Sequence, residues 1–500
     1  MAHHFANGIP PHLLMWQRVR EYAVPPSMIE HSTARRAAGD WAGACAAARV
    51  YVDLDLRAVR RRHGTDVVTR LRADLRRLAP DLLRWHMPRV APDGRLRPGL
   101  TLSLARYRGS GGTPLHLVVR TPPAWADAGQ RMSLALWEGS GTGVPGHRPH
   151  LHLHPHPHPD RRFRLDLHRH LWDADRSGEL ATRGGAARAG ARGVRFPAPP
   201  DRGRVPEPLF ALGPGWAVGS WAVEAELLLR AEGLPRGAFT VRLGARRRAV
   251  LELVAPDDSH VPTFRRLPEG ALPAQEIAAL PVLPEAAARV LPDLELLRAG
   301  LVVAGRLHPL VAPSLAASAP ASLDGPVPEP GDPHRVECRG RLHRIALRDG
   351  VLTAVDHDPA QLRREELLVA LGGPALPCLR AIDTVHRDPE ALPAVRERLG
   401  HGDVAGALAV VEELLGPGAV LRDGPLREEL ESAAARRVEH GLFRSGLVAP
   451  RPADGAAESG NLSDAGRGKA GHRPRIDRRT PKPVRRKLNS RSRPRTGLAA

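Results

Sequence analysis

Two short segments near opposite ends of the chain share the same order of apolar and polar positions. They are residues 39–45, Gly-Asp-Trp-Ala-Gly-Ala-Cys, and residues 402–408, Gly-Asp-Val-Ala-Gly-Ala-Leu. In each, an Asp lies where a helix would begin and can accept a hydrogen bond from a free backbone N–H. Apolar residues then follow at i, i+3, i+4 and i+7, the spacing of one helix face. With helices expected upstream, over 27–38 and 390–399, both segments predict a helix–turn–helix hairpin.

A glycine occupies the same place inside the second helix of each hairpin. Gly43 and Gly406 would each weaken their helix by about 1 kcal/mol relative to Ala. We therefore interpret both glycines as positions where a neighbouring helix packs closely against the backbone.

The apolar spacing changes twice along the rest of the chain. A helical pattern over 65–83, bent or restarted at Pro80, completes a helical unit that follows a loose leader with one short helix near 13–21. The middle of the chain shows period-two alternation with Gly and Pro turns, typical of short antiparallel strands. The strands expected there are 100–104, 115–120, 133–137, 165–167, 239–243 and 249–254, with helices over 216–231 and 284–303.

A linker and a second helical region follow. Five prolines and few apolar residues mark 319–333 as a linker, and 334–356 alternates as a hairpin with an Asp-Gly turn. The pattern is helical over 359–447. These patterns predict an α+β protein with a helical N-terminal unit, a β-rich middle, a small hairpin followed by a helical domain, and a disordered basic tail. The predicted boundaries are 1–26, 27–88, 89–318 with a His-rich loop at 147–160, 319–333, 334–447 and 448–500.

The positive charge is concentrated in that tail. Residues 451–500 contain 14 Lys and Arg and only four Asp and Glu. Their net charge of +10 is half of the chain's net charge of +20. The basic residues Arg478, Arg479, Arg485, Arg486 and Lys487 are candidates for non-specific, salt-sensitive contacts with nucleic acid. The tail lacks aromatic residues for base stacking, so a solubilising role or binding to an acidic protein stays open.

Cysteine usage and hydropathy indicate the compartment. Cys45, Cys338 and Cys378 are odd in number and form no Cys-x-x-Cys pair, which argues against a disulfide framework or a cysteine-rich zinc site. No stretch approaches the roughly 20 apolar residues of a membrane helix. We expect a cytoplasmic protein without membrane association.

The most prominent candidate for chemistry is a run of histidines. His152, His154, His156 and His158 alternate with other residues, so an extended chain would project them from one side, where imidazoles could bind zinc. A low-complexity run without a metal role is the alternative. The nearby His168 and His170 are interpreted as packing at a strand edge.

A second candidate is Asp356-His357-Asp358. It could orient a general base or bind a metal, but Asp358 followed by Pro359 is better explained as the start of a helix. The chain contains no P-loop, dinucleotide-binding, zinc-protease or nucleophile-elbow motif, so nothing in it indicates an enzyme.

Two resemblances accompany these patterns. The segments 39–45 and 402–408 resemble the helical hairpins of tetratricopeptide-type proteins, without their 34-residue period. Residues 34–85 and 356–383 resemble an uncharacterised family of high-GC actinobacterial proteins with no assigned activity. The leading hypothesis is a non-catalytic interaction or scaffold protein whose hairpins contact an unidentified protein partner. The alternatives are a metal-binding or metal-dependent protein using the His-rich run, and nucleic-acid association through the tail.

Overall fold

The computed structural model describes the chain in segments that all belong to the first of two compact units, Met1–Pro450. The described residues are 9–109, 114–139, 158–184, 212–213, 215–234, 236–245, 247–254, 262–268, 270–316, 335–338, 340–348, 351–387, 391–416, 418 and 420–445. The predicted linker 319–333 and the basic tail, with its five candidate residues, lie outside them.

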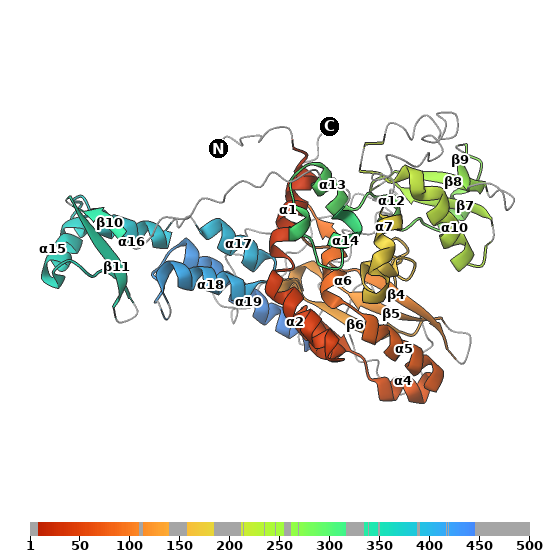
Figure 1. The fold of residues 1–500 in the computed structure, drawn as a ribbon, viewed down its shortest axis with the longest axis horizontal. Coiled ribbons are helices and arrows are strands. Elements are labelled where there is room, and N and C mark those ends of the chain that lie inside the picture. Colours follow the sequence, from red (N-terminus) through yellow and green to blue (C-terminus); the bar gives the residue numbers. More distant parts are fainter. Residues whose placement is uncertain are drawn as a thin grey trace, which may run out of the picture. The chain divides into compact units, whose positions relative to one another are not determined.

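The α+β fold class predicted from the sequence is confirmed, with helices and several small sheets along the chain (Figure 1). The main sheet has the strand order β1-β6-β5-β4. Its strands are β1 (Val50–Asp53), β4 (Thr101–Arg108), β5 (Pro114–Arg120) and β6 (Met132–Trp137). The three predicted strands pair antiparallel, while β1, which was not predicted, runs parallel to β6. The first five residues of β4 are all buried, because both faces of the sheet are covered.

Six helices flank this sheet. They are α1 (Pro11–Tyr22), α2 (Pro26–Ala37), α3 (Trp41–Ala47), α4 (Leu56–His63), α5 (Thr65–Arg77) and α6 (Pro80–His86). The helix predicted over 65–83 is divided at Pro80, which starts α6 because a proline at the first helical position loses no hydrogen bond. The short α4 was not predicted.

The expected loose leader instead contains a firmly packed helix. Arg20 of α1 is 6% exposed and forms a two-pronged ion pair with buried Asp293, at 2.8 Å from Nε and 2.7 Å from Nη2. The indole N–H of Trp85 donates to the same carboxylate at 3.0 Å. Helix α1 is therefore part of the main core.

A smaller group of elements is built around the fully buried Trp221. It contains α10 (Trp221–Ala231), β7 (Gly237–Arg242), β8 (Arg248–Val254), β9 (Thr263–Arg266), α11 (Ala274–Ala279) and α12 (Glu285–Ala288), whereas α13 (Pro292–Arg298) places Leu297 in the main core. The helix predicted over 284–303 is broken into α12 and α13 before Pro292. Strand β9 was not predicted.

The region before this group departs from the sequence-based prediction. Residues 165–167, expected to form a strand, lie in a turn, and the neighbouring Arg164 forms an isolated bridge with Ser103. Short helical turns follow: η3 (Arg169–Leu171), η4 (Ala174–Glu179) and α7 (Leu180–Arg183). The other short elements are η1 (Ala124–Ala126), η2 (Ala128–Gln130), η5 (Val218–Ser220), η6 (Ala304–Arg306), α14 (Ala312–Leu315), β2 (Arg89–Val90) and β3 (Arg95–Leu96).

The C-terminal part of the unit has its own core. It contains β10 (Arg335–Cys338), β11 (Arg341–Arg348), β12 (Val351–Ala354), α15 (Pro359–Ala370), α16 (Pro377–Arg387), α17 (Leu392–Gly400), α18 (Val404–Leu415) and α19 (Pro425–Arg444). The predicted hairpin is confirmed as β11 and β12, and β10 adds a third antiparallel strand.

Both predicted helical hairpins are confirmed, and their turns have the same geometry. Asp40 caps α3 by accepting from the Gly43 N–H at 2.8 Å, and Asp403 caps α18 by accepting from the Gly406 N–H at 3.3 Å. The preceding Gly39 and Gly402 have φ of 76° and 81°, which favours glycine. In both turns an Arg five residues before the Asp also binds its carboxylate, at 3.0 Å and 3.2 Å.

The reason given for the glycines within these helices was wrong. A Cβ atom at Gly43 would lie 2.1 Å from Oδ2 of Asp40, and one at Gly406 would lie 2.1 Å from Oδ2 of Asp403. The close neighbour is therefore the capping carboxylate itself, and each glycine makes room for its own cap.

This geometry predicts the sign of three substitutions. We expect Gly43→Ala and Gly406→Ala each to lower the free energy of unfolding by about 1–2 kcal/mol, because the cap must move. Gly441→Ala in α19, where an added Cβ meets nothing within 4 Å, should raise it by about 0.5–1 kcal/mol. Urea unfolding followed by circular dichroism measures all three, and stabilisation by Gly43→Ala would contradict the assignment.

Candidate functional site

Three potential metal ligands from three separate elements meet in the C-terminal core. They are Cys338 at the end of β10, His357 in the turn after β12, and Cys378 near the start of α16. One ligand atom from each, the two Sγ atoms and an imidazole nitrogen, lies within 4.8 Å of the others. Both cysteines are fully buried and form no disulfide.

The local structure explains how His357 reaches the sulfur atoms. The Asp356 carboxylate accepts from the backbone N–H of Arg344 at 2.8 Å and from its guanidinium at 2.8 Å, which fixes the turn to β11. These hydrogen bonds lower the pKa of Asp356 to about 2. Asp358 caps α15 by accepting from the Gln361 N–H at 3.2 Å. The helix-start interpretation of this motif is confirmed, and the same turn directs His357 to the cysteines.

A second imidazole lies against the first. His343 of β11 stacks on His357 with ring centroids 4.2 Å apart and planes inclined by 11°. Nδ1 of His343 is buried and makes no hydrogen bond within the described residues. The centre therefore contains two thiols and one imidazole, with the ring of His343 stacked beside it.

This donor set suits zinc better than a hard cation, which prefers oxygen ligands. Tetrahedral zinc with Zn–S near 2.3 Å and Zn–N near 2.0 Å places ligand atoms about 3.5–3.8 Å apart. The observed upper limit of 4.8 Å is about 1 Å longer, a difference that small side-chain rotations cover. Burial, followed by the hydrogen bond with Cys338, raises the pKa of the Cys378 thiol to about 12, so it is no free thiolate nucleophile at neutral pH.

The sequence-predicted ligands lie elsewhere. His152, His154 and His156 lie outside the described residues, so their metal binding stays a prediction, as does nucleic-acid binding by the tail. His158 is exposed, and its ring contacts Trp137 edge-on at 6.0 Å. Cys338 and Cys378 were dismissed on their spacing, and only a strand-paired fold brings them together.

His168 and His170 form a buried structural cluster on a helical turn and not at a strand edge. Nε2 of His168 lies 3.2 Å from the Glu224 carboxylate, which also receives a two-pronged ion pair from Arg183. Burial, then the neighbouring His168, keeps the pKa of His170 well below its ordinary value. The cluster thus joins η3 to α10 through the neutral imidazole of His170 and the ion-paired carboxylate of Glu224.

No protein-family model, curated protein or solved structure matches this chain. Within the described residues, each helix is too short or too polar to cross a lipid bilayer.

The buried Glu224 generates a prediction about acid stability. Burial alone would raise its pKa, but hydrogen bonds from His168 and Arg183 outweigh burial and lower it to about 2. Because the folded-state pKa is depressed, the carboxylate stabilises the fold above pH 4.5, and this contribution of about 3 kcal/mol is lost as pH falls towards 2. Urea unfolding at several pH values should show that the free energy of unfolding falls less steeply with acid in Glu224→Gln than in the wild type.

Glu226→Gln is the matched control, since Glu226 is partly exposed on the same helix and pairs with Arg230. It should change stability by less than about 1 kcal/mol at every pH. If the free energies of unfolding of the two variants fall equally with acid, the buried carboxylate is not the titrating group.

Proposed function

We propose that this chain is a zinc-binding interaction protein whose zinc ion is structural. The observation that carries the proposal is the convergence of Cys338, His357 and Cys378 within 4.8 Å. The three residues stand on different elements, so one ion would join β10, the β12–α15 turn and α16. Structural zinc sites have a fourth protein ligand, and His343 would supply it only after its ring turns out of the stack on His357.

The burial of the donors supports a structural role for the ion. Both sulfur atoms lie in a core with Ile345, Leu352 and Ile382, where a catalytic zinc would need an open position for water. Zinc binding to such a site stabilises folding directly, since the ligands are not preassembled in the unfolded chain.

Metal analysis of tag-free, full-length protein purified under reducing conditions tests the proposal. We expect about one zinc per chain after dialysis, and none in Cys338→Ser or Cys378→Ser. Cys45→Ser is the matched control, because Cys45 is equally buried but belongs to the main core, and it should retain the ion. Triple replacement of His152, His154 and His156 by Ala should also retain it.

A measurement on the unmodified chain guards against variants that fail to fold. Replacement of zinc by cobalt should produce thiolate-to-cobalt charge-transfer absorption together with tetrahedral ligand-field bands. Metal-free wild-type protein, or zinc that is lost only in the His-run variant, would overturn the proposal.

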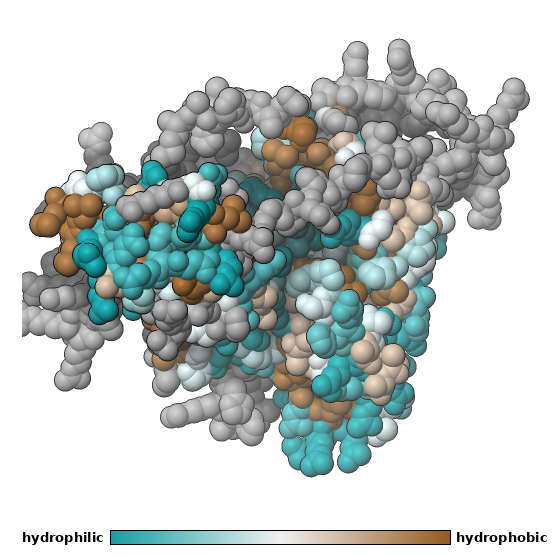
Figure 2. Space-filling model, turned by 60° about the vertical axis from the view of Figure 1, so that its left-hand side comes forward, coloured by the Kyte–Doolittle hydropathy of each residue, from teal (hydrophilic) through white to brown (hydrophobic). Residues whose placement is uncertain are grey.

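The interaction role rests on a different surface from the one expected. The apolar faces of the two hairpins are largely packed into cores, as the fully buried Ala44, Cys45 and Ala407 show, although Leu408 is 43% accessible. Helix α15 instead leaves its second half exposed: Leu367, Leu368 and Leu371 are 64%, 46% and 86% accessible. In Figure 2, where this part of the chain comes forward, apolar side chains lie at its surface beside polar ones.

We propose that this stripe contacts the same stripe of a second copy of the chain. Arg364, Leu367, Leu368 and Leu371 share one helix face at i, i+3, i+4 and i+7. An antiparallel arrangement is self-complementary, because it joins the leucines and places each Arg364 near the negative end of the partner helix. One twelve-residue helix buries less than the roughly 1,200 Å² of a stable interface, so the dimer should be weak.

Sedimentation equilibrium over a concentration series tests this pairing. Leu367→Glu with Leu371→Glu should give a monomer at concentrations where the wild type dimerises. Val303→Glu is the control, since Val303 is also exposed but belongs to another part of the unit. A wild type that stays monomeric throughout, or a dimer that persists in the double variant, would contradict pairing through α15.

A further inference from the structure

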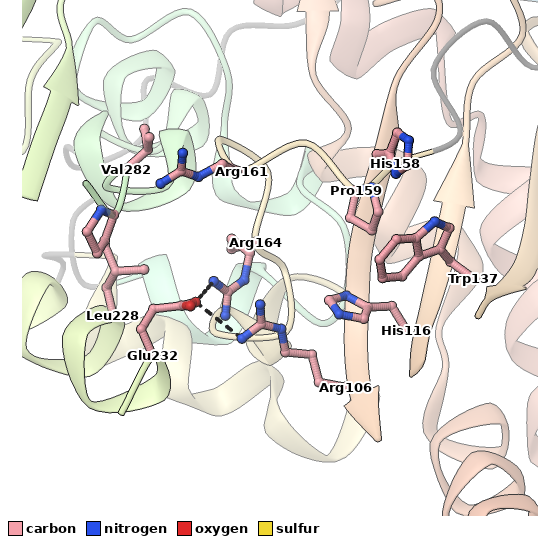
Figure 3. Close-up of a pocket in the computed structure, with 11 residues that line it drawn as sticks. Arg106, His116, Trp137, His158, Pro159, Arg161, Arg164, Leu228, Glu232 and Val282 are labelled. Carbon is pink, nitrogen blue, oxygen red and sulfur yellow. Dashed lines mark hydrogen bonds and ion pairs between the residues drawn. The ribbon is translucent and has the colours of Figure 1, made fainter. Parts of the chain in front are cut away.

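A cavity of about 270 Å³ lies between the main sheet and α10, distant in sequence from the cysteines. One wall comes from three adjacent strands: Arg106 on β4, His116 on β5 and Trp137 on β6 (Figure 3). The opposite wall is formed by Leu228 and Glu232 at the end of α10 and by residues 281–282. The volume lies just below the range of drug-sized sites, which suits a small ligand.

The lining carries more positive than negative charge. Three guanidinium groups, from Arg106, Arg161 and Arg164, line the cavity with one carboxylate, that of Glu232, and the Asp166 carboxylate outside the lining pairs with Arg164 and Arg106. Arg161 donates to the backbone carbonyls of residues 278–280 at the end of α11, which satisfies its hydrogen bonds without neutralising its charge. The cavity therefore attracts an anion.

Arg106 is the guanidinium that can turn to a ligand at low cost. Its side chain is 37% exposed, and its contacts with Glu232 and Asp166 are 3.2 Å and 3.8 Å long. Glu232 would stay paired if Arg106 moved, because Arg164 also donates to it. Arg164 itself is held in a two-pronged pair with Asp166, at 2.8 Å in both contacts.

An aromatic surface adjoins these charges. Trp137 is partly exposed to the cavity and contacts His116 edge-on at 5.0 Å. Nδ1 of His116 lies 2.9 Å from the buried Ser103 hydroxyl, which orients the ring and leaves Nε2 for a ligand. Burial, then the charge of Arg106, lowers the pKa of His116 to about 4, so the imidazole is neutral at pH 7 and still has a hydrogen-bonding nitrogen.

We propose that this cavity binds a small aromatic compound that carries a carboxylate or a phosphate group. The planar ring contacts Trp137 and the apolar wall at Leu228 and Val282. The oxyanion binds the Arg106 guanidinium and the Nε2–H of His116, in the tautomer whose Nδ1 accepts from Ser103. This site is independent of the zinc centre and of α15.

Titration of the full-length protein with benzoate, adenosine monophosphate and inorganic phosphate tests the proposal. Tryptophan fluorescence and calorimetry are the two readouts. Benzoate or the nucleotide should bind saturably, and tighter binding by one of them identifies the carboxylate or the phosphate as the preferred group. Trp137→Phe should remove the fluorescence change.

Two arginine variants distinguish a site from general charge attraction. Arg106→Gln should weaken binding about 10- to 100-fold, as expected for loss of a charge-assisted hydrogen bond. Arg265→Gln, which removes a more exposed arginine paired with Glu252 outside the cavity, should leave affinity unchanged. Absence of saturable binding by all three probes, phosphate binding as tight as nucleotide binding, or an unaffected Arg106→Gln variant would overturn the proposal.

Discussion

The carboxylate of Asp403 joins the second helical hairpin to the N-terminal part of the unit. It caps α18, binds Arg398 of the preceding helix at 3.2 Å, and binds Arg49 at 3.1 Å, close to the end of α3. Arg49 also donates to the carbonyl of His401, and a Cβ at Gly402 would lie 2.3 Å from the carbonyl oxygen of Gly129. Because Asp403 is 4% exposed, replacing it would remove a buried carboxylate that Arg49 and Arg398 share, a change that typically costs about 3–5 kcal/mol. The second hairpin turn is thus fixed to the first hairpin by charge and by backbone fit together.

The abundant arginines act mainly as connectors inside this unit. Arg20 joins α1 to α13 through Asp293, and Arg84 joins the end of α3 to η2 by donating to the carbonyls of Ala48 and Gln130. A guanidinium has five N–H donors in a fixed plane, so one side chain can satisfy several backbone carbonyls at once. This use of arginine explains how a chain with few aromatic residues orders its long connecting segments. The charge count of the sequence alone does not reveal it.

Local patterns predicted the helices and most strands, because period and capping are encoded within a few neighbouring residues. The Asp40 and Asp403 caps are the clearest case. Long-range features were not predicted. Strand β1 pairs with β6 across about 80 residues, and α1 is fixed by the carboxylate of Asp293, far along the chain. The candidate zinc centre was not predicted for the same reason, because Cys338 and Cys378 become neighbours only through strand pairing and the packing of α16. A histidine between two aspartates, the second of which caps α15, was the available signal at His357.

Strand β1 lies at an edge of the main sheet, and its outward neighbours come from the far end of the unit. Arg444 of α19 pairs with Asp53 at 2.7 Å and lies over the ring of Tyr51, which also stacks on His440. A nascent chain therefore completes its sheet long before the helix that covers this edge has been synthesised. During that interval the side chains of Tyr51 and Asp53 lack their partners from α19, and the edge strand is less protected from other strands. Truncation before α19 would leave the same edge permanently open to aggregation.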